Sequence, residues 1–138
     1  MRLIVDVNII FAAVLRDSKT REMLMYPFFE YFSPEFTLEE IENVKAELVK
    51  RAEQPELAVS NMLSEVLKRI TIFPKEYYTA KISEAKKLLP KIHDEDLPYI
   101  ALALSIPVEG IWSNDTAFSD QTKVKIWRTA DILEMFKK

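Results

Sequence analysis

The sequence predicts an α/β fold in which a mainly parallel sheet of about five strands lies between two layers of helices. Short apolar runs that suit buried strands alternate with longer segments of helical periodicity along the chain. This alternation favours a parallel sheet covered on both faces, because parallel strands are joined by crossovers that usually contain a helix. The chain has 138 residues, of which 49% are hydrophobic and 30% charged. We therefore expect residues 1–138 to form one domain with a substantial core.

The expected strands are apolar or aromatic and end at breakers. An apolar run opens the chain, Pro34 follows an aromatic run, and Pro74 follows a β-branched run. We expect the aromatic residues from Phe28 to Phe32 to belong to the core. The expected strands are residues 3–6, 28–33, 70–73, 110–114 and 124–127.

The expected helices are recognised by apolar spacing and by start signals. Leu38, Ile41 and Val44 begin a spacing of three to four residues that marks an amphipathic helix. Pro55 stands at the start of one helix and Pro98 in the first turn of another, where proline is tolerated. The expected helices are residues 7–15, 20–26, 37–51, 56–67, 77–89, 97–104 and 130–138.

The composition excludes several kinds of chemistry. The chain has no cysteine, which removes thiol nucleophiles, disulfides and thiolate zinc sites. A single histidine, His93, leaves little room for a histidine-rich metal site or a Ser-His-Asp triad. Gly110 is the only glycine, so a glycine-rich phosphate loop is excluded. Any reaction must be carried out by carboxylates, hydroxyls, amides, lysines and arginines.

Charge and hydropathy limit the cellular location and the binding partners that we expect. No apolar run approaches the roughly 18 residues needed to span a bilayer, and the N-terminus lacks the basic start of a secretory signal. We therefore expect a cytoplasmic protein without a membrane partner. The net charge of −3, from 19 basic and 22 acidic residues, argues against binding nucleic acid by bulk charge. A local basic rim around an acidic centre is compatible with this net charge.

Four acidic residues fall where an expected strand passes into a helix or loop, or just inside a helix: Asp6, Glu40, Asp96 and Asp115. Parallel strands present their carboxyl ends at one edge of the sheet, where ligands bind. Two carboxylates about 5 Å apart repel by roughly 3 kcal/mol at an effective dielectric near 20, and Mg²⁺ or Mn²⁺ prefers such oxygen ligands. The four acids therefore predict a divalent-cation site.

Neighbouring polar residues extend this prediction. Asn8 interrupts an apolar run two positions after the first acid, and Ser113 precedes the last acid at the same expected edge. Asp120 is either a fifth acid of the site or a solvated loop residue. Asp94 and Glu95 are expected to face solvent, although they could assist.

Helix capping is a simpler explanation for each acid taken alone. Aspartate is a favoured N-cap, which could explain Asp6, Asp96 and Asp115. Thr37 and Glu40 fit a capping box.

Helical geometry distinguishes some of these alternatives. At 100° per residue, Glu40 lies at the edge of the apolar arc of its helix, whereas Glu39 faces nearly opposite that arc. Asp96 falls within about 40° of Ile100 if the helix includes it. A carboxylate inside an apolar arc is costly unless it is paired or bound to a metal.

In their order and spacing these segments resemble the PIN domain, a family of metal-dependent ribonucleases that includes the VapC-type toxins. The resemblance covers essentially the whole chain. The similar segments are an apolar strand ending in Asp-x-Asn (4–9), a helix-borne Glu (38–41), an Asp-x-Pro and Ala-Leu-Ala-Leu segment (96–104), a strand ending in Ser-x-Asp (112–115), and a closing strand and helix (124–133).

The resemblance implies a function and a set of site residues. It implies that Asp6, Glu40, Asp96 and Asp115 hold Mg²⁺ or Mn²⁺ for phosphodiester hydrolysis in RNA, with support from two neighbours, Asn8 and Ser113. By analogy it also implies an antitoxin protein as partner and a homodimer. A non-catalytic PIN-like module that binds nucleic acid or protein is the alternative, and in that case the acids cap helices or hold a structural ion.

Overall fold

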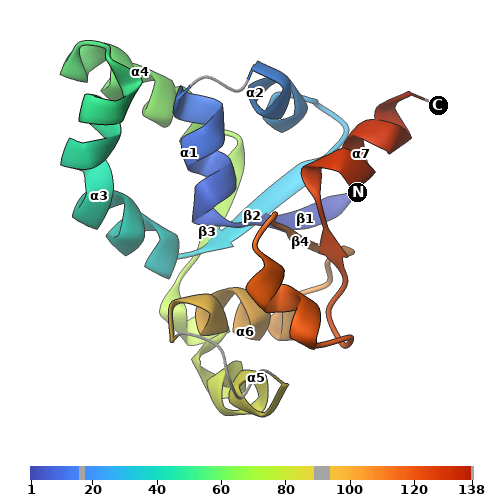
Figure 1. Ribbon diagram of the computed structural model, residues 1–138. Coiled ribbons are helices and arrows are strands. Elements are labelled where there is room, and N and C mark those ends of the chain that lie inside the picture. The colour runs from blue at the N-terminus through green and yellow to red at the C-terminus, as the bar shows by residue number, and fades with distance from the viewer. Residues whose placement is uncertain (16–17, 89–93, 138) are drawn as a thin grey trace.

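A computed structural model describes residues 1–15, 18–88 and 94–137 of the chain (Figure 1). The strands of the described part are β1 (Arg2–Val5), β2 (Glu30–Pro34), β3 (Ile70–Phe73), β4 (Gly110–Trp112) and β5 (Ile126–Trp127). They form one five-stranded sheet in the order β3-β2-β1-β4-β5, and all neighbouring strands are parallel. The predicted α/β class and the parallel sheet are confirmed.

Alternation along the strands divides the core into two parts. Leu3 and Val5 of β1 belong to one cluster of buried side chains, and Ile4 belongs to the other. The register pairs Ile4 with Phe32 of β2 and with Ile111 of β4, and all three lie in the second cluster. Because successive side chains of a strand point to opposite faces, each face of the sheet carries its own apolar layer.

Helices cover both faces, which gives the expected three layers (Figure 1). The first face is covered by α1 (Val7–Leu15), α2 (Ser18–Leu24), α3 (Phe36–Ala52), α4 (Glu56–Leu67) and α7 (Thr129–Phe136). The opposite face is covered by α5 (Ile82–Leu88) and α6 (Leu97–Ser105). Over the ranges that the structure describes, no helix is long and apolar enough to cross a membrane.

The segment predicted as a helix over 77–89 is different in the structure. Two short 3₁₀ turns, η1 (Lys75–Tyr77) and η2 (Thr79–Lys81), precede α5. Between them Tyr78 is buried in the second core cluster, and the hydroxyl of Thr79 donates a hydrogen bond to the carbonyl of Lys75 (2.6 Å). This local bond offers the backbone an alternative to a continuous α-helix. Residues 89–93, which include His93, lie outside the described residues.

The aromatic segment predicted as a strand from residue 28 begins later, at Glu30. The expectation that Phe28 is a core residue is wrong, because its side chain is 77% exposed. Tyr31 and Phe32 are buried as expected. Burial begins at Tyr31, inside the part of the segment that pairs with β1 and β3, and the aromatic composition alone could not locate that boundary.

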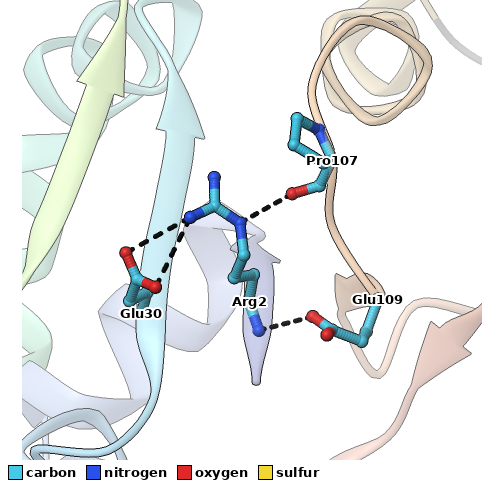
Figure 2. Close-up of polar contacts among 4 residues, drawn as sticks. All are labelled: Arg2, Glu30, Pro107 and Glu109. Atoms are coloured by element: carbon cyan, nitrogen blue, oxygen red, sulfur yellow. Dashed lines mark hydrogen bonds and ion pairs between the residues drawn. The ribbon is translucent and has the colours of Figure 1, made fainter.

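An arginine at the amino edge of the sheet connects the central strands (Figure 2). The guanidinium of Arg2 donates to the Pro107 carbonyl (2.7 Å) and lies 3.3 Å from the Glu30 carboxylate. The backbone N–H of Arg2 donates to the carboxylate of Glu109 (2.5 Å). These contacts join β1 to β2 and to the segment before β4, at the edge opposite the acids.

Gly110 occupies a position that other residues cannot adopt without strain. Its φ is 152°, and an added Cβ would lie 2.1 Å from the carbonyl oxygen of Lys125. The glycine therefore permits the close approach of β4 to the segment that enters β5.

Candidate active site

The strand order places a crevice between β1 and β4. The chain moves outward from β1 through β2 to β3 and then crosses to β4 on the other side of β1. Ligands bind outside the carboxyl ends of the strands at such a switch point. Asp6 directly follows β1 and Ser113 directly follows β4, and the N–H of Asp6 donates to the carbonyl of Trp112 (3.2 Å).

A cleft of about 250 Å³ lies at this edge of the sheet, and all four predicted acids line it. They come from four separate segments of the chain, since Asp6 follows β1, Glu40 lies on α3, Asp96 precedes α6 and Asp115 follows β4. The structure therefore brings the four carboxylates together around one space. Their role as ligands stays a prediction.

Asp6 is the most buried of these acids. Its side chain is 5% exposed. One carboxylate oxygen accepts a hydrogen bond from the hydroxyl of Ser113 (2.7 Å), and the other accepts from the backbone N–H of Asn8 (3.4 Å). Burial raises the pKa of Asp6 above its usual value, and these two hydrogen bonds limit the rise. The side chain of Asn8 is exposed at the wall of the cleft.

Ser113 connects two of the acids. It donates to Asp6, and its oxygen accepts from the backbone N–H of Asp115 (3.0 Å). Asp115 in turn accepts from the N–H of Ala117 (2.9 Å) at the start of η4 (Thr116–Asp120). The capping explanation is therefore correct for one oxygen of Asp115, although the residue also lines the cleft.

Glu40 is half-buried and interacts with a tyrosine that the sequence did not single out. The hydroxyl of Tyr99 donates to its carboxylate (2.6 Å). Burial raises the pKa of Glu40 to about 7, the Tyr99 hydrogen bond opposes that rise, and the negative charge of Asp6 adds to it. Burial also raises the pKa of Tyr99 well above its usual value, so Tyr99 remains a protonated donor.

A chain of hydroxyl groups continues behind Glu40. Tyr99 contacts the hydroxyl of Thr37 (2.8 Å), Thr37 contacts that of Ser33 (2.6 Å), and Ser33 donates to the carbonyl of Val5 (2.9 Å). The chain therefore connects the carboxylate of Glu40 to the carboxyl end of β1 through three hydroxyl groups.

The capping box predicted for Thr37 and Glu40 is wrong. Helix α3 begins one residue earlier, at Phe36, and no side chain caps its N-terminus. The hydroxyl of Thr37 instead contacts Ser33 and Tyr99, two side chains brought near it by the tertiary fold. Glu40 is therefore not explained by capping.

Helical geometry correctly separated Glu40 from its neighbour. Glu39 is exposed and forms a surface ion pair with Lys75 (3.0 Å), whereas Glu40 faces the cleft. Tyr99 could have been found by the same reasoning. It lies three residues after Asp96, and residues with that spacing lie on the same side of a helix.

The segment before α6 contributes two acids to the cleft. Asp96 occupies the N-cap position of α6 but makes no capping hydrogen bond, and it is half-buried in the cleft wall. Glu95 is exposed, as expected, and it also lines the cleft. The side chain of Asp120 lies outside what the structure describes.

The residues around the cleft suit a hard cation by their chemistry, since every charged side chain in its wall is a carboxylate. Across residues 1–15, 18–88 and 94–137, no three acidic or histidine side chains lie close enough together to form a ready-made metal cage. Mg²⁺ often keeps several of its waters and is held by one or two carboxylates. The arrangement therefore fits an ion that keeps part of its hydration shell better than a fully enclosed one.

Comparison with known proteins identifies the family. The sequence profile of the PIN domain matches residues 4–137. The chain belongs to the PIN-domain family. PIN domains generally use divalent metal ions. A search of curated protein sequences found no match.

A solved structure shares the PIN fold of this chain. It is the crystal structure of VapBC2 from Rickettsia felis bound to a DNA fragment from their promoter. The match has a TM-score of 0.73 at 15% identity and covers 93% of this chain and 98% of that one. At this identity the match establishes the fold alone.

Proposed function

We propose that this PIN-domain protein is a divalent-cation-dependent endoribonuclease that hydrolyses phosphodiester bonds in RNA. The single observation that carries the proposal is the convergence of Asp6, Glu40, Asp96 and Asp115 on one cleft at the switch point of the sheet. Mg²⁺ or Mn²⁺ is the cofactor that these oxygen ligands suit. In this proposal residues 1–138 act as one nuclease domain in the cytoplasm.

The side chains of the cleft would bind and orient the reacting groups. A bound divalent cation supplies a water of lowered pKa and positive charge beside the phosphate. Ser113 fixes the rotamer of Asp6, and Tyr99 fixes that of Glu40, through hydrogen bonds of 2.7 and 2.6 Å. In the reaction, water adds to phosphorus, the bond from phosphorus to one ribose oxygen breaks, and that oxygen leaves with a proton. Without cysteine in the chain, no thiol nucleophile competes with this route.

The family and the shared fold favour a physiological role as the toxin of a toxin–antitoxin pair. The resemblance to VapC-type toxins and the fold shared with a chain of the VapBC2 structure support this role. An antitoxin protein would then be the partner, and a homodimer the assembly. A non-catalytic PIN-like binding module is the alternative, and the capping bond of Asp115 is the observation that favours it.

Cleavage of a single-stranded RNA with a fluorophore and a quencher tests the proposal. We expect cleavage with Mg²⁺ or Mn²⁺ and none with a chelator. Asp96→Asn and Glu40→Gln should each reduce cleavage at least a hundredfold. Glu39→Gln is the matched control, because it makes the same chemical change on the neighbouring exposed residue and breaks only a surface ion pair with Lys75.

The outcomes separate the two candidate functions. Cleavage that survives Asp96→Asn and Glu40→Gln would point to a contaminating nuclease and would contradict the proposal. Metal binding without any cleavage of RNA would support the binding module instead.

A further inference from the structure

A second hollow of about 210 Å³ continues the acidic cleft. The two hollows share Asn8, Phe11 and Val44 in their walls, and Glu47 and Arg51 line the second one. Helix α1 packs against α3, and both helices leave the same edge of the sheet (Figure 1). The two hollows therefore form one continuous depression between these helices, which we call the α1–α3 groove.

Helical geometry shows how far the groove extends from the acids. Glu40, Val44, Glu47 and Arg51 fall within an arc of about 60° on α3 at 100° per residue. Arg51 lies eleven residues after Glu40, which is about 16 Å along the helix axis. This length matches roughly five stacked nucleotides at a rise of about 3.4 Å each, and fewer nucleotides of an extended strand.

Arg51 supplies a positive charge to this groove. Its side chain is exposed and makes no hydrogen bond or ion pair with any residue that the structure describes. This includes Glu47, which lies one turn earlier on the same side of α3. A guanidinium group presents five N–H donors in a planar fork that matches a phosphate. Arg51 therefore places a guanidinium group in the wall of a groove that begins at the acids.

Phe11 supplies an aromatic surface between the acids at one end of the groove and Arg51 at the other. It packs against the core from one side and lines both hollows from the other. Bases of a single strand stack on such rings without regard to sequence. A groove with a stacking ring and a guanidinium suits an RNA strand. An amphipathic peptide helix would need a more continuous apolar wall than one containing Asn8, Glu47 and Arg51.

We propose that the α1–α3 groove binds the single-stranded RNA that flanks the scissile phosphate, with Arg51 contacting a phosphate and Phe11 contacting a base. The proposal rests on the RNA hydrolysis proposed for the acidic cleft and adds the path of the substrate. Arg51 and Phe11 are positioning residues that lie away from the bond that breaks. Glu47 opposes the bound strand, because its charge has the same sign as the phosphates.

The test measures binding and cleavage separately. A fluorescently labelled single-stranded RNA of twelve nucleotides is titrated with Asp96→Asn protein in Mg²⁺ at several salt concentrations. Adding Arg51→Gln should weaken binding five- to tenfold and lower the slope of log K against log salt by about 0.7, the value for one lost phosphate contact on a single strand. Phe11→Leu should weaken binding without changing the slope, and Glu47→Gln should strengthen it.

Lys50→Gln is the matched control, because it removes the same charge from a neighbouring exposed residue that does not line the groove. Equal losses for Arg51→Gln and Lys50→Gln would indicate diffuse charge attraction and overturn the proposal. Unchanged RNA binding with Arg51→Gln would also overturn it, as expected if the groove holds a protein segment.

Cleavage by the otherwise wild-type protein separates the two proposals. If the protein cuts RNA but Arg51→Gln has no effect, the groove assignment fails and hydrolysis stands. If the protein does not cut RNA but Arg51→Gln still lowers affinity and slope, hydrolysis fails and the groove assignment stands.

Discussion

Replacing Tyr99 with phenylalanine tests whether the hydroxyl chain sets the charge of Glu40. The change keeps a ring of nearly the same size at a position that is 1% exposed, so the core stays filled. It removes the donor that lies 2.6 Å from the Glu40 carboxylate. Because this hydrogen bond favours the charged carboxylate, its loss should raise the pKa of Glu40 further above the value of about 7.

The magnitude follows from the strength of one hydrogen bond. A hydrogen bond to a charged group contributes about 1.5–3 kcal/mol, and the lower end suits a half-buried carboxylate that keeps some contact with water. At 1.36 kcal/mol for a tenfold change in protonation, this loss makes Glu40 roughly ten times harder to ionise. The charged fraction of Glu40 at pH 7 then falls from about one half to about one tenth. A divalent cation needs the charged form, so its affinity at pH 7 should fall about fivefold.

Calorimetric titration with Mn²⁺ at pH 7 and at pH 9 checks this expectation. We expect the fivefold difference at pH 7 to disappear at pH 9, where Glu40 is charged in both proteins. Tyr78→Phe is the control, because Tyr78 is another buried tyrosine whose hydroxyl accepts from the N–H of Phe36 (3.4 Å) and does not line the cleft. An equal loss at both pH values would refute the reasoning, and so would the same pH-dependent loss in Tyr78→Phe.

Three further predictions concern stability and the neighbouring acid. The unfolding free energy of the metal-free protein should fall by roughly 1–2 kcal/mol between pH 4.5 and 7. Folded Glu40 keeps its proton up to about pH 7, whereas unfolded Glu40 loses it near pH 4.5. Mg²⁺ should remove this pH dependence, as measured by urea unfolding. Gly110→Ala should lower the unfolding free energy by at least about 2 kcal/mol, because its Cβ would lie 2.1 Å from the Lys125 carbonyl oxygen. Ser113→Ala should remove the donor to Asp6 and destabilise the protein by about 1–3 kcal/mol. Because this hydrogen bond lowers the pKa of Asp6, the affinity for Mn²⁺ should increase at higher pH in the variant than in wild type.

Each of these predictions has a contradicting result. Metal-free stability that rises between pH 4.5 and 7 would mean that folding does not raise the pKa of Glu40. A urea midpoint of Gly110→Ala equal to that of wild type would mean that β4 can move away from Lys125 at little cost. Unchanged pH dependence of Mn²⁺ affinity in Ser113→Ala would show that the serine does not influence the charge of Asp6.

The sheet could be predicted because its determinants are local. The strand-to-helix transition at Asp6 and the alternation of apolar runs with helical periodicity are both visible in a few neighbouring residues. The exposure of Glu39 and the position of Glu40 at the cleft could also be predicted, because they depend only on the geometry of one helix. Parallel pairing then determines which strand ends share an edge of the sheet.

The features that were missed depend on contacts between distant parts of the chain. Thr37 and Glu40 satisfy a local capping pattern, yet Ser33 and Tyr99 provide the partners that their oxygens use. The spacing from Asp96 indicates which side of α6 Tyr99 occupies. Its contact with the carboxylate of Glu40, 59 positions away in the sequence, has no local signal. Phe28 was wrongly placed in the core, because the sequence could not locate where strand pairing begins.

The most direct test of the account is the anomalous diffraction of crystals soaked in Mn²⁺ above neutral pH. We predict a peak inside the cleft, within about 2.5 Å of oxygen atoms from at least two of Asp6, Glu40, Asp96 and Asp115. The absence of any peak in the cleft at saturating Mn²⁺, with the four carboxylates ordered and open to solvent, would contradict the account.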